Sequence, residues 1–150
     1  MKTITPDIFC SKNVSKIMHK KPDIEKALFS GLKRFFHIVN AHSEAFKYIS
    51  DPKIKADFHQ SGSGNQYFTY KHHGADRTQL RMNYSVECDT RGNITRLYIY
   101  DVIAKRSDVR GGKNKRENHL ERFADVDDLD QYQANDFMRF DSIDCTVTLK

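Results

Sequence analysis

The sequence has no long hydrophobic run, and this absence sets the first limits on what the chain can be. Its longest apolar stretch is only a few residues, so we expect no transmembrane helix. The first 13 residues, MKTITPDIFCSKN, lack the apolar core of a secretory signal, so we expect none. The three cysteines, Cys10, Cys88 and Cys145, have neither metal-ligand spacing nor the even number of a disulfide set. They read as free thiols, which predicts a cytoplasmic protein.

Motifs for common cofactors are also missing. The chain has no P-loop, no G-x-G-x-x-G, no G-x-S-x-G and no kinase signature. Four histidines, His59, His72, His73 and His119, lack the i, i+4 spacing of a helical metal site. We therefore predict no metal and no cofactor.

Charge is present but unevenly placed. The formal net charge is +5, but residues 117–150 hold nine acidic and three basic side chains, whereas residues 1–116 hold 11 acidic and 22 basic ones. A basic body followed by an acidic extension favours a polyanionic partner, although an unevenly charged solvated surface would look the same. We expect the acidic extension to compete with that partner for the basic face.

The first part of the chain has helical periodicity. Ser11 is suited to cap a short helix that ends before Pro22, where a second helix begins. The second helix has an apolar stripe at spacings of three and four: Ile24, Leu28, Leu32, Phe35 and Val39. A third helical piece is expected over residues 43–50, followed by a flexible loop at residues 61–65.

After that loop the period changes to two, which is typical of strands. Strands are predicted over residues 66–72, 79–88 and 93–104, with Gly92 in the hairpin turn between the last two. Residues 142–149 also alternate and are expected to close the sheet. The length suits one domain, 1–150, in which 117–150 is an acidic extension that adds a last strand. We predict an α+β fold, with N-terminal helices packed on one face of a small antiparallel sheet of three to five strands.

Alternation also predicts what the other sheet face carries. We expect Leu80 and every second residue after it to pack against the helices, together with Leu97, Ile99 and Ile103 of the next strand. The residues between them then point to the opposite face of the sheet, and several of these are basic or aromatic. These side chains are Lys71, Arg81, Arg96, Tyr98 and Tyr100. Cations bind phosphates and aromatic rings stack on unpaired bases, so such a face suits single-stranded RNA. The alternative is a two-sided sheet in which the tyrosines cover more core.

The order of these segments resembles the RelE/ParE toxin superfamily. The residues that carry the resemblance are Leu80-Arg-Met-Asn-Tyr-Ser-Val86, the strand from Ile94 to Val102, and Ala104-Lys-Arg-Ser-Asp-Val109. The resemblance implies helices on one face of a small antiparallel sheet. For the RelE branch it also implies metal-independent cleavage of mRNA on the ribosome, and an antitoxin protein as a partner.

The resemblance implies roles for particular residues. Arg81 and Arg106 would neutralise phosphate charge, and Lys71 and His73 would share the acid–base work, because an imidazole titrates near neutrality. Arg96, Tyr98, Tyr100, Arg110 and Lys113 would bind RNA. Adjacent loop histidines such as His72 and His73 can equally be ordinary turn residues.

One departure keeps other functions open. Family members often end the last basic run with a tyrosine or histidine, and here Arg110 occupies that place. The alternative function is a binding module without catalysis: a ParE-like inhibitor of a protein such as gyrase, or an adaptor for nucleic acid or the ribosome. A nuclease that cuts free tRNA is a third reading.

Overall fold

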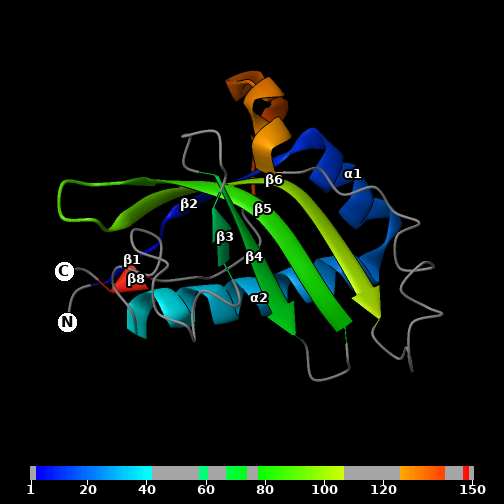
Figure 1. Cartoon of the computed structure of the whole chain (residues 1–150), viewed down its shortest axis with the longest axis horizontal. Coiled ribbons are helices and arrows are strands. Elements are labelled where there is room, and N and C mark those ends of the chain that lie inside the picture. The colour runs from blue at the N-terminus through cyan, green and yellow to red at the C-terminus, as the bar shows by residue number, and fades with distance from the viewer. Residues whose placement is uncertain are drawn as a thin grey trace.

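A computed structural model describes residues 3–41, 58–60, 67–73, 78–106, 126–140 and 147–148 of the chain. These residues form an α+β fold in which two helices pack on one face of a curved sheet (Figure 1). The predicted helix at 43–50 and the predicted loop at 61–65 lie outside the described residues, as do positions 107–116 of the basic stretch that follows the last apolar strand.

The two helices form where the sequence predicts them. Helix α1 spans Lys12–Lys20, and the Ser11 hydroxyl caps it by accepting the backbone N–H of Val14 at 3.1 Å. Helix α2 spans Pro22–Ala41 and begins at the proline, whose missing N–H costs nothing in a first turn. The predicted stripe of α2 is confirmed, because all five of its apolar side chains are buried against the sheet.

Among the described residues, the main sheet has six strands in the order β3-β4-β5-β6-β2-β7. Their bounds are β2 Asp7–Ser11, β3 Phe58–Gln60, β4 Phe68–His73, β5 Thr78–Cys88, β6 Ile94–Arg106 and β7 Phe137–Arg139. The long β5–β6 hairpin extends beyond the body of the molecule (Figure 1). Its turn confirms the expected role of Gly92, whose φ of 81° lies in the left-handed region.

The prediction of an antiparallel sheet of three to five strands is wrong in two respects. The sheet has six strands, and β2 runs parallel to β6, with Ile8 opposite Leu97. Strand β2 is only five residues long and directly precedes α1. The strand that it pairs with in parallel, β6, lies more than 80 residues further along the chain. Local alternation carries no signal for such a pairing.

The predicted final strand does not close the main sheet. Of residues 142–149, the described part is β8, Val147–Thr148, and it pairs with β1, Thr3–Ile4, in a separate two-stranded sheet. The outer position in the main sheet, beside β2, belongs instead to β7. Two short 3-10 helices, η2 at Val126–Gln131 and η3 at Ala134–Asp136, precede it.

The core lies between the helices and one face of the sheet. Leu80, Met82 and Tyr84 alternate along β5 and are fully buried, as predicted. A register shift between Asn83 and Tyr84 changes the alternation on β6, so that Val102 faces the core and Ile103 lies opposite Arg81 on the other face. Ile103 was predicted on the helical side, and the bulge is the reason that it is not.

No helix among the described residues is long and apolar enough to cross a membrane. Of the described cysteines, Cys10 is buried and Cys88 is exposed. Burial raises the pKa of the Cys10 thiol to about 11, because a thiolate is poorly solvated there.

Candidate functional site

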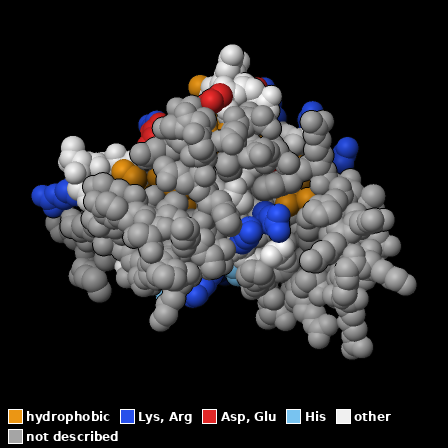
Figure 2. Space-filling model, in the orientation of Figure 1, with side chains coloured by type: hydrophobic (Ala, Val, Ile, Leu, Met, Phe, Trp, Pro, Cys, Tyr) orange, Lys and Arg blue, Asp and Glu red, His pale blue; other side chains and the backbone are white. Residues whose placement is uncertain are grey.

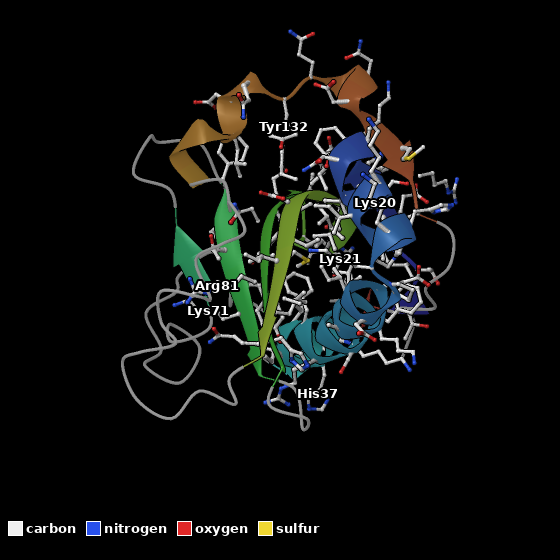
Figure 3. All side chains as sticks on the ribbon, turned by 90° about the vertical axis from the view of Figure 1, so that its right-hand side faces the viewer. Lys20, Lys21, His37, Lys71, Arg81 and Tyr132 are labelled. Carbon is white, nitrogen blue, oxygen red and sulfur yellow. The ribbon has the colours of Figure 1, made fainter. Side chains whose placement is uncertain are left out.

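Lys71 and Arg81 lie directly opposite each other on the antiparallel strands β4 and β5. Both side chains are half-buried and point away from the helices (Figure 3). In the space-filling view, basic side chains emerge over β4 and β5 (Figure 2). Two like charges in directly opposed positions concentrate positive potential at this point of the face.

Arg81 has a further feature. Its Nε is buried and has no hydrogen-bond partner among the described residues. An unsatisfied buried donor costs about 1 to 3 kcal/mol. Because the Arg81 side chain as a whole is only half-buried, its guanidinium can donate to a phosphate oxygen, so this part of the face is suited to an oxyanion.

A buried polar row lies beside the Lys71–Arg81 pair. The Thr69 hydroxyl donates to Asn83 Oδ1 at 2.6 Å across β4 and β5, and Asn83 lies opposite Asp101 on β6. All three residues are buried, and the Asp101 carboxylate accepts its neighbour's backbone N–H at 3.0 Å. Asp101 is not among the site residues predicted from the sequence, although one signal marks it: it is the only acidic residue of the most apolar strand.

The predicted aromatic residues lie on the expected face but within a second cluster. Tyr98 stacks on Phe9 of β2 with ring centroids 5.2 Å apart. Tyr100 is only 9% exposed, and its ring makes edge contacts with Tyr67, Tyr132 and Phe137. For Tyr100, the two-sided sheet that the sequence left open as an alternative fits the structure.

The covering residues come from the segment 126–140, which we call the cover segment. It crosses one end of the sheet on the side away from α2, with Tyr132 directed toward the sheet (Figure 3). Leu129, within the segment, is fully buried. Burial, with a hydrogen bond to Asp130, raises the pKa of Tyr67 to about 12. Burial also raises the pKa of Tyr100 and of Tyr132. The segment therefore occupies the surface on which a base would stack.

Arg96 lies far from Arg81 on the same face. It is opposite Glu87, six residues along β5 from Arg81, which corresponds to about 20 Å. Its guanidinium pairs with the Glu87 carboxylate at 3.5 Å, and both side chains are about half exposed, at 51% and 53%. The Tyr98 hydroxyl, 3.1 Å from Glu87, and the carboxylate itself raise the pKa of Arg96. The structure thus separates Arg96 from the Lys71–Arg81 pair.

The two adjacent histidines occupy different strand positions. His72 lies on the helical side, where its Nε2 is 3.3 Å from the Ser30 hydroxyl of α2. It is therefore on the opposite face from Arg81. The backbone of His73 is opposite Gln79, and the backbone of Gln79 is opposite Lys105.

Other predicted residues are placed only in part. The backbone of Arg106 is opposite Thr78, which is three residues before Arg81, so Arg106 and Arg81 occupy positions of opposite alternation. The backbone of Lys105 is opposite Gln79, which is two residues before Arg81 and has the same alternation as Arg81. The side chains of His73, Lys105 and Arg106 lie outside the description, as do Arg110 and Lys113 entirely.

The described residues include no group of three or more histidine, cysteine, aspartate or glutamate side chains placed to hold a metal ion. Comparisons of the chain with protein families, curated proteins and solved structures found no match. The function must therefore be argued from the site alone.

Proposed function

We propose that this chain binds RNA through the phosphates, at the face of β4, β5 and β6 that carries Lys71 and Arg81. The observation that carries the proposal is the direct opposition of these two cations, on the face turned away from the helices. The half-buried guanidinium of Arg81 supports it, because a phosphate oxygen is an acceptor that matches it. The excess of basic residues in positions 1–116 agrees with a polyanionic partner.

We further propose that the bound RNA is cleaved without a metal. In this reaction the ribose 2′-oxygen attacks the adjacent phosphorus and the bond from phosphorus to the 5′-oxygen breaks, which leaves a 2′,3′-cyclic phosphate. A base accepts the 2′-hydroxyl proton and an acid donates a proton to the departing 5′-oxygen. Arg81 and Lys71 would stabilise the charge on the phosphorane, and His73 would move the protons. His72 is a poor candidate for that work, because it lies on the other face beside Ser30.

In line with the RelE resemblance, we propose that the substrate is mRNA on cytoplasmic ribosomes, that cleavage arrests growth, and that an antitoxin protein is a partner. The second candidate is RNA binding without cleavage. The burial of Tyr100 favours it, because this residue cannot orient a base while the cover segment lies over it.

The test uses the full chain with a defined mRNA, with and without ribosomes, and in EDTA. We expect cleavage in the presence of EDTA and products that end in a cyclic or 3′-phosphate. Arg81→Ala should abolish both cleavage and binding. Arg34→Ala is the matched control, because Arg34 is exposed on α2 and its loss changes the net charge equally.

The outcomes separate the candidates. Binding that depends on Arg81 without any cleavage supports the binding module. Cleavage of free tRNA without ribosomes points to the third reading of the sequence. Binding and cleavage that are both indifferent to Arg81→Ala would overturn the proposal.

A further inference from the structure

The outer face of α1 is formed by basic side chains. Lys12, Lys16 and Lys20 follow one another at intervals of four residues and are all exposed, with His19 beside them. Helical geometry places successive members of this row about 6 Å apart along the axis. The helix contains no acidic residue. The buried residues of α1, Val14 and Met18, lie on its other side against the core.

The row formed by Lys12, Lys16 and Lys20 lowers the stability of α1. Like charges at i, i+4 destabilise a helix by about 0.2 to 0.5 kcal/mol per pair, and the row contains two such pairs. Lys12 is also at the first helical position, where the helix dipole disfavours a cation. The ion pairs seen among the described residues join Arg96 to Glu87 and Arg139 to Asp7, and neither involves the row. An external anion would offset the repulsion.

The chemistry of the face favours phosphates over a protein surface. Protein interfaces are depleted of lysine and depend on aromatic or aliphatic anchors. Among the described residues, Met138 of β7 is the one large apolar side chain that is exposed, at 43%. The exposed face of α1 thus offers charge without an apolar anchor. A straight row of flexible cations suits a regular line of phosphates, as on the backbone of a duplex.

We propose that α1 is a second nucleic-acid site, in which Lys12, Lys16 and Lys20 bind the phosphate backbone of a double-stranded region. Lys20 and the Lys71–Arg81 pair lie on opposite sides of the molecule (Figure 3). A duplex on α1 and a single strand on the sheet face can therefore be bound together. This inference does not rest on the proposed function, because different residues on a different face carry it.

The test is the salt dependence of binding to a 16-base-pair DNA duplex, measured for the full chain and for Lys12→Gln/Lys16→Gln/Lys20→Gln. Each neutralised phosphate contributes about 0.9 to the slope of log K against log salt concentration. We expect the triple variant to bind more weakly and to lose about 2.7 units of slope. Its thermal unfolding temperature should be unchanged or higher, because like-charge repulsion is removed.

The matched control is Lys26→Gln/Lys33→Gln/Arg34→Gln, which removes three exposed charges from α2. It should keep most of the affinity and slope. Equal losses in both triple variants would show that net charge alone drives binding and would overturn the inference, as would an unchanged slope in the α1 variant.

A single-stranded RNA titration separates this inference from the proposed function. Single-stranded binding should depend on Arg81 and persist in the α1 variant. If Arg81→Ala has no effect there while the α1 variant loses duplex binding, the proposed function fails and the inference stands. If the α1 variant binds the duplex normally while Arg81→Ala loses single-stranded binding, the inference fails and the proposed function stands.

Discussion

The ring of Tyr132 stands nearly perpendicular to the ring of Tyr100, at 83°, with their centroids 5.3 Å apart. Through this contact the cover segment closes part of the face that alternation predicts to be open. Phe137 adds a second edge contact to Tyr100 at 4.9 Å. The sheet therefore has packed side chains on both faces, with the helices on one and the cover segment on part of the other.

Tyr132→Ala should loosen the cover segment without unfolding the main core. Tyr132 is half-buried, so we expect a loss of about 2 kcal/mol in the free energy of unfolding, less than for a fully buried aromatic residue. Urea denaturation measures the loss. Gln131→Ala, at the exposed position on the other side of Tyr132, should change stability by less than about 0.5 kcal/mol. Equal stability of the Tyr132 variant and the parent would show that the ring contact contributes nothing.

The negative charge of the cover segment should oppose RNA binding. Converting Asp125, Asp127, Asp128 and Asp130 to asparagine removes four negative charges close in sequence to the residues that cover Tyr100. We expect tighter binding of single-stranded RNA, and a smaller difference from the parent at high salt because ions screen the repulsion. Asparagine at 130 keeps an oxygen that can accept from Tyr67. Unchanged affinity in the folded variant would refute the competition.

The parts of the fold that could be predicted are those with a local period. The stripe on α2 and the alternation of Leu80, Met82 and Tyr84 each repeat within one element, so the chain itself reports which side is buried. The capping role of Ser11 is equally local. Each of these expectations is confirmed.

What could not be predicted depends on contacts between distant residues. Nothing near Phe9 indicates that its strand inserts between β6 and β7, or that its ring stacks on Tyr98. The cover segment has only weak periodicity, so its position over Tyr100 is determined by tertiary contacts and not by a local sequence pattern. The register shift after Asn83 leaves no mark in the sequence, although it moves Ile103 to the other face.

The β5–β6 hairpin should weaken in acid because of Asp89. One carboxylate oxygen of Asp89 accepts the backbone N–H groups of Arg91 and Asn93, and the other accepts the Asn93 side chain. Hydrogen bonds from Asn93, above all, lower the pKa of Asp89 below 3.8. The folded-state pKa is therefore below the unfolded value. The stabilisation is present above the unfolded pKa and is lost as the pH falls through the folded one.

Asp89→Ala should therefore lower stability at pH 6 and remove part of the acid sensitivity below pH 4. Unfolding curves for the parent and the variant between pH 6 and pH 2 measure both effects. Asp23→Ala, which removes an exposed carboxylate from α2 and leaves the hairpin unchanged in sequence, is the control for a general loss of one carboxylate. Parallel pH profiles for the Asp89 variant and the parent would contradict the assignment.

At Gly31, α2 packs closely against side chains of β4 and β5. A methyl group at this position would come within 2.5 Å of Leu80 Cδ2, and 3.6 Å of His72 Cβ. Gly31→Ala should gain about 0.8 to 1 kcal/mol from helix propensity. It should lose about 1 to 3 kcal/mol by overpacking a fully buried leucine, so we expect net destabilisation.

A double variant tests whether Leu80 is the cause. In a Leu80→Ala background the obstructing methyl is absent, so the same Gly31→Ala change should stabilise the protein relative to Leu80→Ala alone. Denaturant unfolding of all four proteins gives the coupling energy between the two positions. We expect the coupling energy to show that Gly31→Ala is better tolerated when Leu80 is replaced by alanine. Additive effects would mean that the Leu80 side chain is not the cause of the cost of Gly31→Ala, and that the close approach of α2 to β5 is not fixed by these two residues.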